Sequence, residues 1–171
     1  MDYKVEFSDR KSVSLSVKGG ELKIRAPYGT DKDKIKKIIY EHRRWIATHL
    51  QREIMRSSVE SQLSDTDIRN LKSMAATELR AMTAYYSKIM GLDYTKVNIT
   101  SAKTRFGSCS SKGAISYSYR LMLYPQEARE YVVVHELAHL KEMSHSKRFY
   151  AIVEKYLPDY KARKAKLKMP H

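Results

Sequence analysis

The sequence has a single cysteine among its 171 residues. One cysteine excludes an internal disulfide and is typical of a reducing compartment, so we expect a cytoplasmic protein. The sequence also lacks an apolar run long enough to cross a membrane, and it has no signal-peptide pattern at its start. These absences indicate a soluble chain, and its length is sufficient for one domain with its own hydrophobic core.

Acidic residues are scarce relative to basic ones. The chain has 33 Lys and Arg against 19 Asp and Glu, a formal net charge of +14 and a pI of about 9.8. Such an excess suits nucleic acid, an anionic membrane surface or acidic protein substrates. Part of it lies at the end of the chain, where residues 161–168 hold five cations and no acid. A solvated helical tail is the plainer interpretation, and a nucleic-acid surface is the alternative.

The first third of the chain predicts a β-hairpin followed by a helix. Residues 12–17 and 22–26 alternate polar and apolar side chains with period two, which is typical of half-buried strands. Thr30 is placed to cap a helix over residues 31–55. The polar residues 56–66 are expected to form a loop at a subdomain boundary.

The remaining elements follow from the same periodicities. In chain order we predict a helix over 67–90 stopped by Gly91, a strand over 97–101, a loop over 103–113 and a strand over 114–123. These are followed by a helix with Pro125 in its first turn, called the motif helix because it includes the run 132–140 discussed below, a helix over 146–156 and a basic helix ending near Lys168. Cys109 lies in the predicted loop, and we interpret it as a structural residue close to the site.

The run 132–140 carries the strongest chemical signal in the chain. It reads Val-Val-Val-His-Glu-Leu-Ala-His-Leu, so that His135 and His139 are four residues apart on one face of a helix. Both imidazoles can then reach one metal ion, while Glu136 can reach a water molecule on that ion. This is the metalloprotease signature, in which the glutamate is the general base. Burying three ionisable groups behind three valines is costly unless they bind a metal or one another.

A catalytic zinc site needs a third protein ligand, and His145 is the first candidate. A continuous helix would carry His145 about 15 Å along the axis from His135, so we expect the helix to end near residues 142–143 and the chain to fold back. The spacing matches the metzincin pattern, except that metzincins have Gly where this chain has Glu142. The competing ligand is a carboxylate on the next helix, with Glu154 as the best candidate.

Several further segments together resemble one known family. They are Arg-Phe-Gly-Ser-Cys-Ser-Ser-Lys-Gly from residue 105, Tyr-Arg-Leu from 119, Tyr-Val-Val-Val-His-Glu-Leu-Ala-His-Leu from 131, His-Ser-Lys-Arg-Phe from 145 and Tyr-Leu-Pro-Asp-Tyr from 156. The chain resembles the YgjP-like family of predicted zinc metallopeptidases over nearly its whole length, although the family usually has Trp in place of Phe106. The resemblance implies Zn²⁺ held by His135, His139 and His145, with Glu136 as the catalytic residue.

The resemblance also implies a fold and a domain layout. We expect an α+β, zincin-like domain in which a small β-sheet packs against the motif helix, with several long helices around it. Residues 1–171 are expected to form a single metallopeptidase domain. Its hairpin-and-helix subdomain would cover about 1–60 and its catalytic part about 65–171.

The expected function is hydrolysis of peptide bonds by a metal-activated water, with peptide or protein as substrate. The family is also similar to the SprT-like and Wss-like proteases that act on DNA-bound proteins. A nucleic-acid-associated protease docked through residues 161–168 is therefore one alternative. A non-catalytic zinc-binding module is the other, although a structural site needs a fourth ligand and no general base.

Substrate contacts are expected from the strand predicted over 114–123. In zincins an edge strand typically pairs with extended substrate, which makes Ser116, Ser118 and Arg120 candidate substrate-binding residues. A further hydrogen-bond donor to the oxyanion is expected from one of four residues. These are Tyr117, Tyr119, Arg120 and Tyr131.

Overall fold

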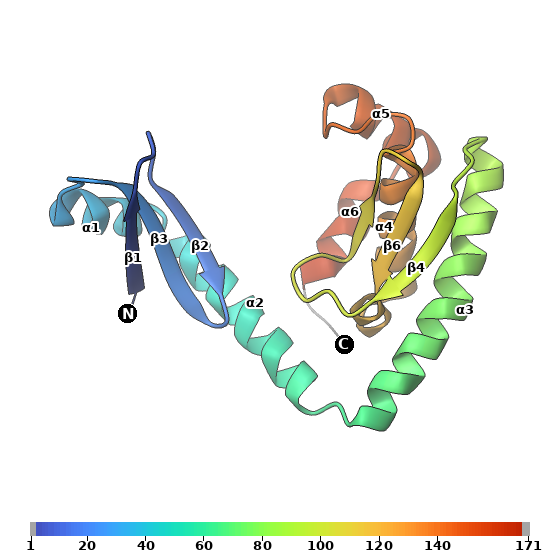
Figure 1. Cartoon of the computed structure of the whole chain (residues 1–171), viewed down its shortest axis with the longest axis horizontal. Coiled ribbons are helices and arrows are strands. Elements are labelled where there is room, and N and C mark those ends of the chain that lie inside the picture. The colour runs from blue at the N-terminus through green and yellow to red at the C-terminus, as the bar shows by residue number, and fades with distance from the viewer. Residues whose placement is uncertain (1–2, 169–171) are drawn as a thin grey trace. The chain divides into compact units, whose positions relative to one another are not determined.

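The computed structural model describes residues 3–168. The chain divides between Gln62 and Leu63 into two compact units. Residues 1–2 and 169–171, which the expected domain includes, lie outside the described residues. None of the described helices is both long and apolar enough to cross a membrane. The two units are considered separately (Figure 1).

The N-terminal unit is a three-stranded sheet with two helices. Its elements are β1 (Tyr3–Ser8), β2 (Ser14–Lys18), β3 (Glu21–Pro27), α1 (Lys32–Glu41) and α2 (Arg43–Ser61). The predicted hairpin is confirmed, because β2 and β3 pair antiparallel, and β1 adds to the other side of β3 in parallel. Leu22 and Ile24 of β3 are fully buried against Ile35 of α1 and Ile46 of α2.

The helical part of this unit differs from the prediction in three ways. Thr30 does not cap the helix, because its hydroxyl donates to the Pro27 carbonyl at 2.7 Å in the preceding turn. The expected single helix is broken at His42, which ends α1 and precedes α2. The expected loop over 56–66 is reduced to residues 62–64, because residues 56–61 continue α2 and the next helix already begins at Asp65. The polar residues of 56–61 form the exposed face of α2, where Arg56 pairs with Glu53 one turn earlier.

The C-terminal unit combines a second three-stranded sheet with the remaining helices. Its elements are α3 (Asp65–Met90), β4 (Lys96–Thr100), β5 (Gly107–Cys109), β6 (Ala114–Ser118), the 3-10 turn η1 (Tyr119–Leu123), α4 (Gln126–Ala138), α5 (Lys147–Tyr156), α6 (Tyr160–Ala165) and η2 (Lys166–Lys168). The strand order is β4-β6-β5, with β6 parallel to β4 and antiparallel to β5 (Figure 1). The predicted α+β architecture is therefore present.

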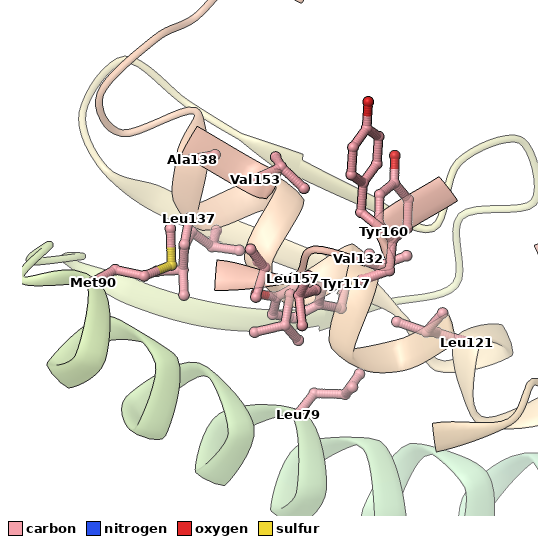
Figure 2. Packing of buried hydrophobic residues seen from close by; sticks show 14 of the residues in the cluster. Leu79, Met90, Tyr117, Leu121, Val132, Leu137, Ala138, Val153, Leu157 and Tyr160 are labelled. Atoms are coloured by element: carbon pink, nitrogen blue, oxygen red, sulfur yellow. The ribbon is translucent and has the colours of Figure 1, made fainter. Parts of the chain in front are cut away.

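The core of this unit lies between α3, α4 and one face of the sheet. Figure 2 shows Leu79 and Met90 of α3 together with Val132 and Leu137 of α4 and Tyr117 of β6. Leu79, Leu137 and Tyr117 are fully buried. The Tyr117 hydroxyl is within 3.1 Å of the Thr83 hydroxyl, so the one polar atom that this ring brings into the core has a partner.

The predicted strand over 114–123 ends five residues early. Ser118 caps the 3-10 turn that follows, since its hydroxyl accepts a hydrogen bond from the Arg120 amide. Tyr119, Arg120 and Leu121 are then buried in succession, which a strand with one solvated face would not allow. The alternation of polar and apolar residues beyond Ser118 was therefore not a strand signal.

The ends of α3 are encoded locally. Ser64 and Asp67 form a capping box, in which the Ser64 hydroxyl accepts from the Asp67 amide and the Asp67 carboxylate accepts from the Ser64 amide at 2.9 Å. At the other end Gly91 adopts φ 63°, ψ 42°, so its prediction as the stop residue is confirmed.

Replacing Ser64 with Ala should remove the capping box and lower the free energy of unfolding of the C-terminal unit by about 1 kcal/mol. Urea unfolding followed by far-UV circular dichroism measures this change. Ser73→Ala is the matched control, because Ser73 is exposed inside the same helix. An equal effect of both substitutions would contradict the capping role.

Candidate metal centre

Helix α4 is held in the core by its apolar side chains. Val133, Val134 and Leu137 are fully buried, and Val132 is 4% exposed. This burial leaves His135 half-buried at the edge of the core and buries Glu136 and His139, at 5% and 8% exposure. The valine run therefore anchors the helix that carries both histidines of the motif.

The helix ends earlier than predicted and turns without a left-handed residue. Helix α4 ends at Ala138, and His139 is its C-cap at φ −64°, ψ −21°. The chain then tightens through hydrogen bonds from the Leu140 amide to the Leu137 carbonyl and from the Glu142 amide to the Ala138 carbonyl. Within residues 3–168 no residue other than glycine has a positive φ. A glycine at position 142 is thus unnecessary, because Glu142 does not adopt a positive φ in this turn.

Glu142 stabilises the segment that leads to the third histidine. One of its carboxylate oxygens accepts from the Ser144 hydroxyl at 2.6 Å and from the Ser144 amide at 3.1 Å. These hydrogen bonds lower the pKa of the Glu142 carboxyl below its ordinary value. His145 follows directly, and Ser146 then caps α5 by accepting from the Phe149 amide.

The three histidines meet at one point. One ligand atom from each of His135, His139 and His145 lies within 4.8 Å of the others, and the Nε2 atoms of His135 and His145 are 3.0 Å apart. Two nitrogens bound tetrahedrally to one zinc ion, each about 2.0 Å from it, would be about 3.3 Å apart. Phe149 packs against all three rings, with centroid distances of 4.4 to 4.9 Å. Glu154, the competing candidate, is exposed on α5 and does not belong to this cluster.

Hydrogen bonds on the far side of the His135 and His139 rings leave the Nε2 atoms of these two rings directed at the cluster. His139 Nδ1 lies 3.1 Å from the Glu142 carbonyl, which only accepts, so Nδ1 carries the proton and Nε2 keeps its lone pair. His135 Nδ1 lies 3.4 Å from the Tyr131 hydroxyl. Outer hydrogen bonds of this kind orient metal-ligating histidines. The donor set therefore fits a divalent cation that prefers neutral imidazole, such as zinc.

Burial favours the neutral forms of His135 and His139. Burial, followed by the charges of His139 and His145, lowers the pKa of His135 to about 3. Burial also lowers the pKa of His139, although its hydrogen bond to the Glu142 carbonyl opposes the change. Burial raises the pKa of the Tyr131 phenol, so that its hydroxyl remains protonated beside His135.

Glu136 lies against the edge strand of the sheet. Burial raises the pKa of its carboxyl to about 7, and the positive charge of Arg105 opposes this rise. A Cβ atom built on Gly107 would lie 2.5 Å from Oε1 of Glu136. Gly107 is therefore needed for close approach between the backbone of β5 and the carboxylate, a role that the sequence did not reveal.

The candidate substrate strand is not an edge. Strand β6 pairs with β4 on one side and β5 on the other, so the expectation that residues 114–123 present a free edge is wrong. The edge beside α4 belongs to β5, which lay inside the predicted loop 103–113. Its three residues are too few to show an alternating pattern.

The three candidate substrate residues have different environments. Ser116 is half-buried on β6, whereas Ser118 is 1% exposed and its hydroxyl donates to the Ala102 carbonyl at 2.7 Å. Arg120 is 8% exposed and donates to the Ser101 carbonyl at 2.7 Å. Both Ser118 and Arg120 therefore hold the 101–102 segment against η1.

The candidate oxyanion donors are also distributed unevenly. The Tyr117 hydroxyl contacts Thr83 in the core, and Tyr119 is 2% exposed beneath the Arg120 guanidinium. Of the four candidates, Tyr131 is the one whose hydroxyl lies beside a histidine of the cluster.

Cys109 is half-buried on β5, and burial followed by the charge of Glu136 raises the pKa of its thiol. A protonated thiol is a poor nucleophile and a poor metal ligand.

The basic C-terminal segment packs on the motif helix. Arg163 forms ion pairs with Glu130 of α4 and with Asp159, and Lys166 pairs with Glu127 of α4 at 2.5 Å. Two of the cations at the end of the chain thus neutralise acids on α4. Binding of nucleic acid through this segment remains a prediction, and it would depend on the exposed Lys161, Lys164 and Lys168.

Comparison with protein families gives a match over nearly the whole chain. The family described as "YgjP-like, metallopeptidase domain" matches residues 11–68 and 60–169. The chain belongs to the YgjP-like metallopeptidase family. The predicted family and the zincin-like α+β class are therefore confirmed, and as a metallopeptidase this YgjP-like protein acts on peptide or protein substrates.

Two solved structures resemble part of this YgjP-like chain. The metallopeptidase zymogen of Pyrococcus abyssi abylysin has 27% sequence identity and a TM-score of 0.48, covering 52% of this chain and 90% of that chain. The metallopeptidase zymogen of Methanocaldococcus jannaschii jannalysin has 16% sequence identity and a TM-score of 0.46, and the match covers 54% of this chain and 93% of that chain. No curated protein matches significantly.

Replacing Gly107 with Ala should displace either β5 or the Glu136 carboxylate, because the added methyl group would lie 2.5 Å from Oε1. We expect the free energy of unfolding to fall by about 1–3 kcal/mol, as for other overpacked sites. Urea unfolding provides the measurement, with Ser108→Ala on the same strand as control. Wild-type stability of Gly107→Ala would show that the close contact is absent.

Proposed function

We propose that this chain is a zinc-dependent peptidase in which His135, His139 and His145 hold the metal and Glu136 is the general base. The observation that carries the proposal is the convergence of three imidazoles, with one ligand atom from each within 4.8 Å of the others. The outer nitrogens of His135 and His139 lie beside protein groups, and the Nε2 atoms of His135 and His145 face one another. Three protein ligands leave a fourth position open, as in catalytic zinc sites. A structural zinc module would need a fourth ligand, and the metal-ligating cluster among residues 3–168 contains only these three.

Zinc held by these three histidines would supply a Lewis acid that can polarise the scissile carbonyl and lower the pKa of water from 15.7 toward about 7. Glu136 accepts the proton of the attacking water and delivers it to the leaving amine. Its burial at 5% exposure keeps competing water away from the carboxylate. Phe149 excludes water from the other side of the histidine rings, since it is fully buried against them.

Extended substrate would pair with β5 in this mechanism. Strand β5 is the edge of the sheet that contacts α4, whereas the opposite edge strand, β4, packs against α3. Backbone groups at Gly107 therefore lie beside Glu136 and beside the free edge at once. A peptide added to this edge would bring a backbone carbonyl close to the general base.

The metal content of the purified protein tests the ligand set. We expect about one zinc per chain in the wild-type protein, and at least about a hundredfold weaker zinc binding in His145→Ala, because one of three ligands is lost. Elemental analysis after competition with a chelator measures both, and Glu154→Ala is the control. Full zinc content in His145→Ala together with loss of zinc in Glu154→Ala would show that the third ligand is the Glu154 carboxylate and not His145.

Replacing Glu136 with Gln tests the chemistry. The substitution preserves shape but removes the proton acceptor, so we expect zinc content to be unchanged and the peptide hydrolysis rate to fall by about 10²–10⁴-fold. Hydrolysis of a mixed peptide library, followed by mass spectrometry, gives the rate. Unchanged turnover in a variant with full zinc would refute the role of Glu136 as general base.

A further inference from the structure

A small pocket lies beside Gly107, the residue whose backbone closely approaches Glu136. Its volume is about 100 Å³. The hydroxyl-bearing residues of its wall come from all three strands of the sheet, and its remaining wall includes Arg105 and Gly107. The hydroxyl-bearing residues are Thr100, Ser108, Ser116 and Ser118.

Strand register explains why the hydroxyl groups gather here. Ser108 of β5 is opposite Ser116 of β6, and Thr100 of β4 is opposite Ser118. Directly paired residues point to the same side of a sheet. The intervening Tyr117 points to the other side, where it is fully buried in the core. The pocket therefore occupies the face of the sheet that does not pack on the core.

Two of these hydroxyl groups already have partners. Ser118 donates to the Ala102 carbonyl at 2.7 Å, and Thr100 donates to the Tyr117 carbonyl at 3.3 Å. In the described part of the chain, the Ser108 and Ser116 hydroxyls and the Arg105 guanidinium make no hydrogen bond or ion pair. Three side chains with donor groups thus remain available to a ligand.

Charge and size define the kind of ligand that fits. No acidic residue lines the pocket, and its charged side chain is the Arg105 guanidinium. A guanidinium with hydroxyl donors beside it matches the planar acceptor geometry of a carboxylate. A pocket of about 100 Å³ has room for a group of a few atoms such as a carboxylate.

The position of the pocket connects it to the reaction. Gly107 belongs both to the pocket wall and to the contact with Glu136, so the two sites are separated by one thickness of backbone. The charge of Arg105 also acts on the Glu136 carboxyl. A substrate group in the pocket would thus belong to a residue near the bond that is cleaved.

We propose that this pocket binds a carboxylate of the peptide substrate, with Arg105 as its ion-pair partner and Ser108 and Ser116 as hydrogen-bond donors. The proposal rests on the proposed peptidase function and extends it to substrate selection. Peptides that carry a carboxylate near the scissile bond are then preferred over their uncharged analogues. The carboxylate comes either from an Asp or Glu side chain or from the C-terminus of the peptide.

Matched peptides test this selection with the zinc-loaded full chain. The first peptide is acetyl-Ala-Ala-Ala-Glu-Ala-Ala-amide, the second has Gln in place of Glu, and the third is the Gln peptide with a free C-terminal carboxylate. Affinity is measured by competition against a fluorescent form of the Glu peptide, and cleavage of each peptide is followed separately. In the wild-type protein we expect the Glu peptide, the free-carboxylate peptide or both to bind about tenfold more tightly than the blocked Gln peptide.

Arg105→Gln should abolish this preference, so that all three peptides bind alike. Lys103→Gln is the matched control, because Lys103 is exposed on the same loop, carries the same charge and does not line the pocket. The control should retain the wild-type preference. The three peptides also show which source of carboxylate is used, because only the first has an acidic side chain and only the third has a free terminus.

Equal affinities in the wild-type protein, or a preference that survives in Arg105→Gln, would overturn the proposal. An equal loss of affinity for all three peptides in Arg105→Gln would do so too, since it would show a general role for the arginine. Absence of cleavage by the wild-type protein would count against the peptidase function alone. The affinity ratios would still decide whether the pocket selects a carboxylate.

Discussion

The candidate metal centre depends on the packing of its three histidine rings against the side chain of Phe149. The Phe149 ring contacts the rings of His135, His139 and His145, and the last of these reaches it from a different segment of the chain. Phe149 is fully buried on α5, whose first turn is fixed by the Ser146 cap. The histidine cluster thus depends on how α5 packs against the end of α4, and not on the α4 motif alone.

Features that depend on local geometry could be predicted from the sequence. The shared face of His135 and His139 follows from the helical repeat, and the stop of α3 at Gly91 follows from the need for a left-handed residue. Features that depend on distant pairing could not be predicted. Strand β5 has three residues, and only its pairing with β6 identifies it as a strand and as the edge of the sheet. The edge was therefore assigned to the wrong strand.

Two errors have a different physical origin. Polar residues at the end of α2 were interpreted as a loop, although an exposed helix is equally polar when ion pairs such as Glu53–Arg56 support it. The end of α4 was placed too late because the sequence after His139 contains no residue that forbids a helix. What ends the helix is the hydrogen bonding of the turn itself, including the Glu142 carbonyl that accepts from His139.

The positive charge of the chain also has a structural part. Arg163 and Lys166 neutralise Glu130 and Glu127 on the outer side of α4, so they attach the C-terminal segment to the helix that carries the motif. From composition alone, these two cations would be counted as available to a binding partner. In the structure both form ion pairs within the chain. The number of cations open to a partner is correspondingly smaller than the 33 Lys and Arg of the chain.

The hydrogen bonds behind the two motif histidines differ in what encodes them. His139 is oriented by a backbone carbonyl, which every residue at position 142 possesses, whereas His135 faces the hydroxyl of one side chain, Tyr131. The orientation of His139 thus depends on the backbone path, and a side-chain substitution at position 142 would not remove its hydrogen-bond partner. That of His135 is open to evolutionary adjustment, because exchanging tyrosine for phenylalanine would remove the partner and leave the packing nearly unchanged.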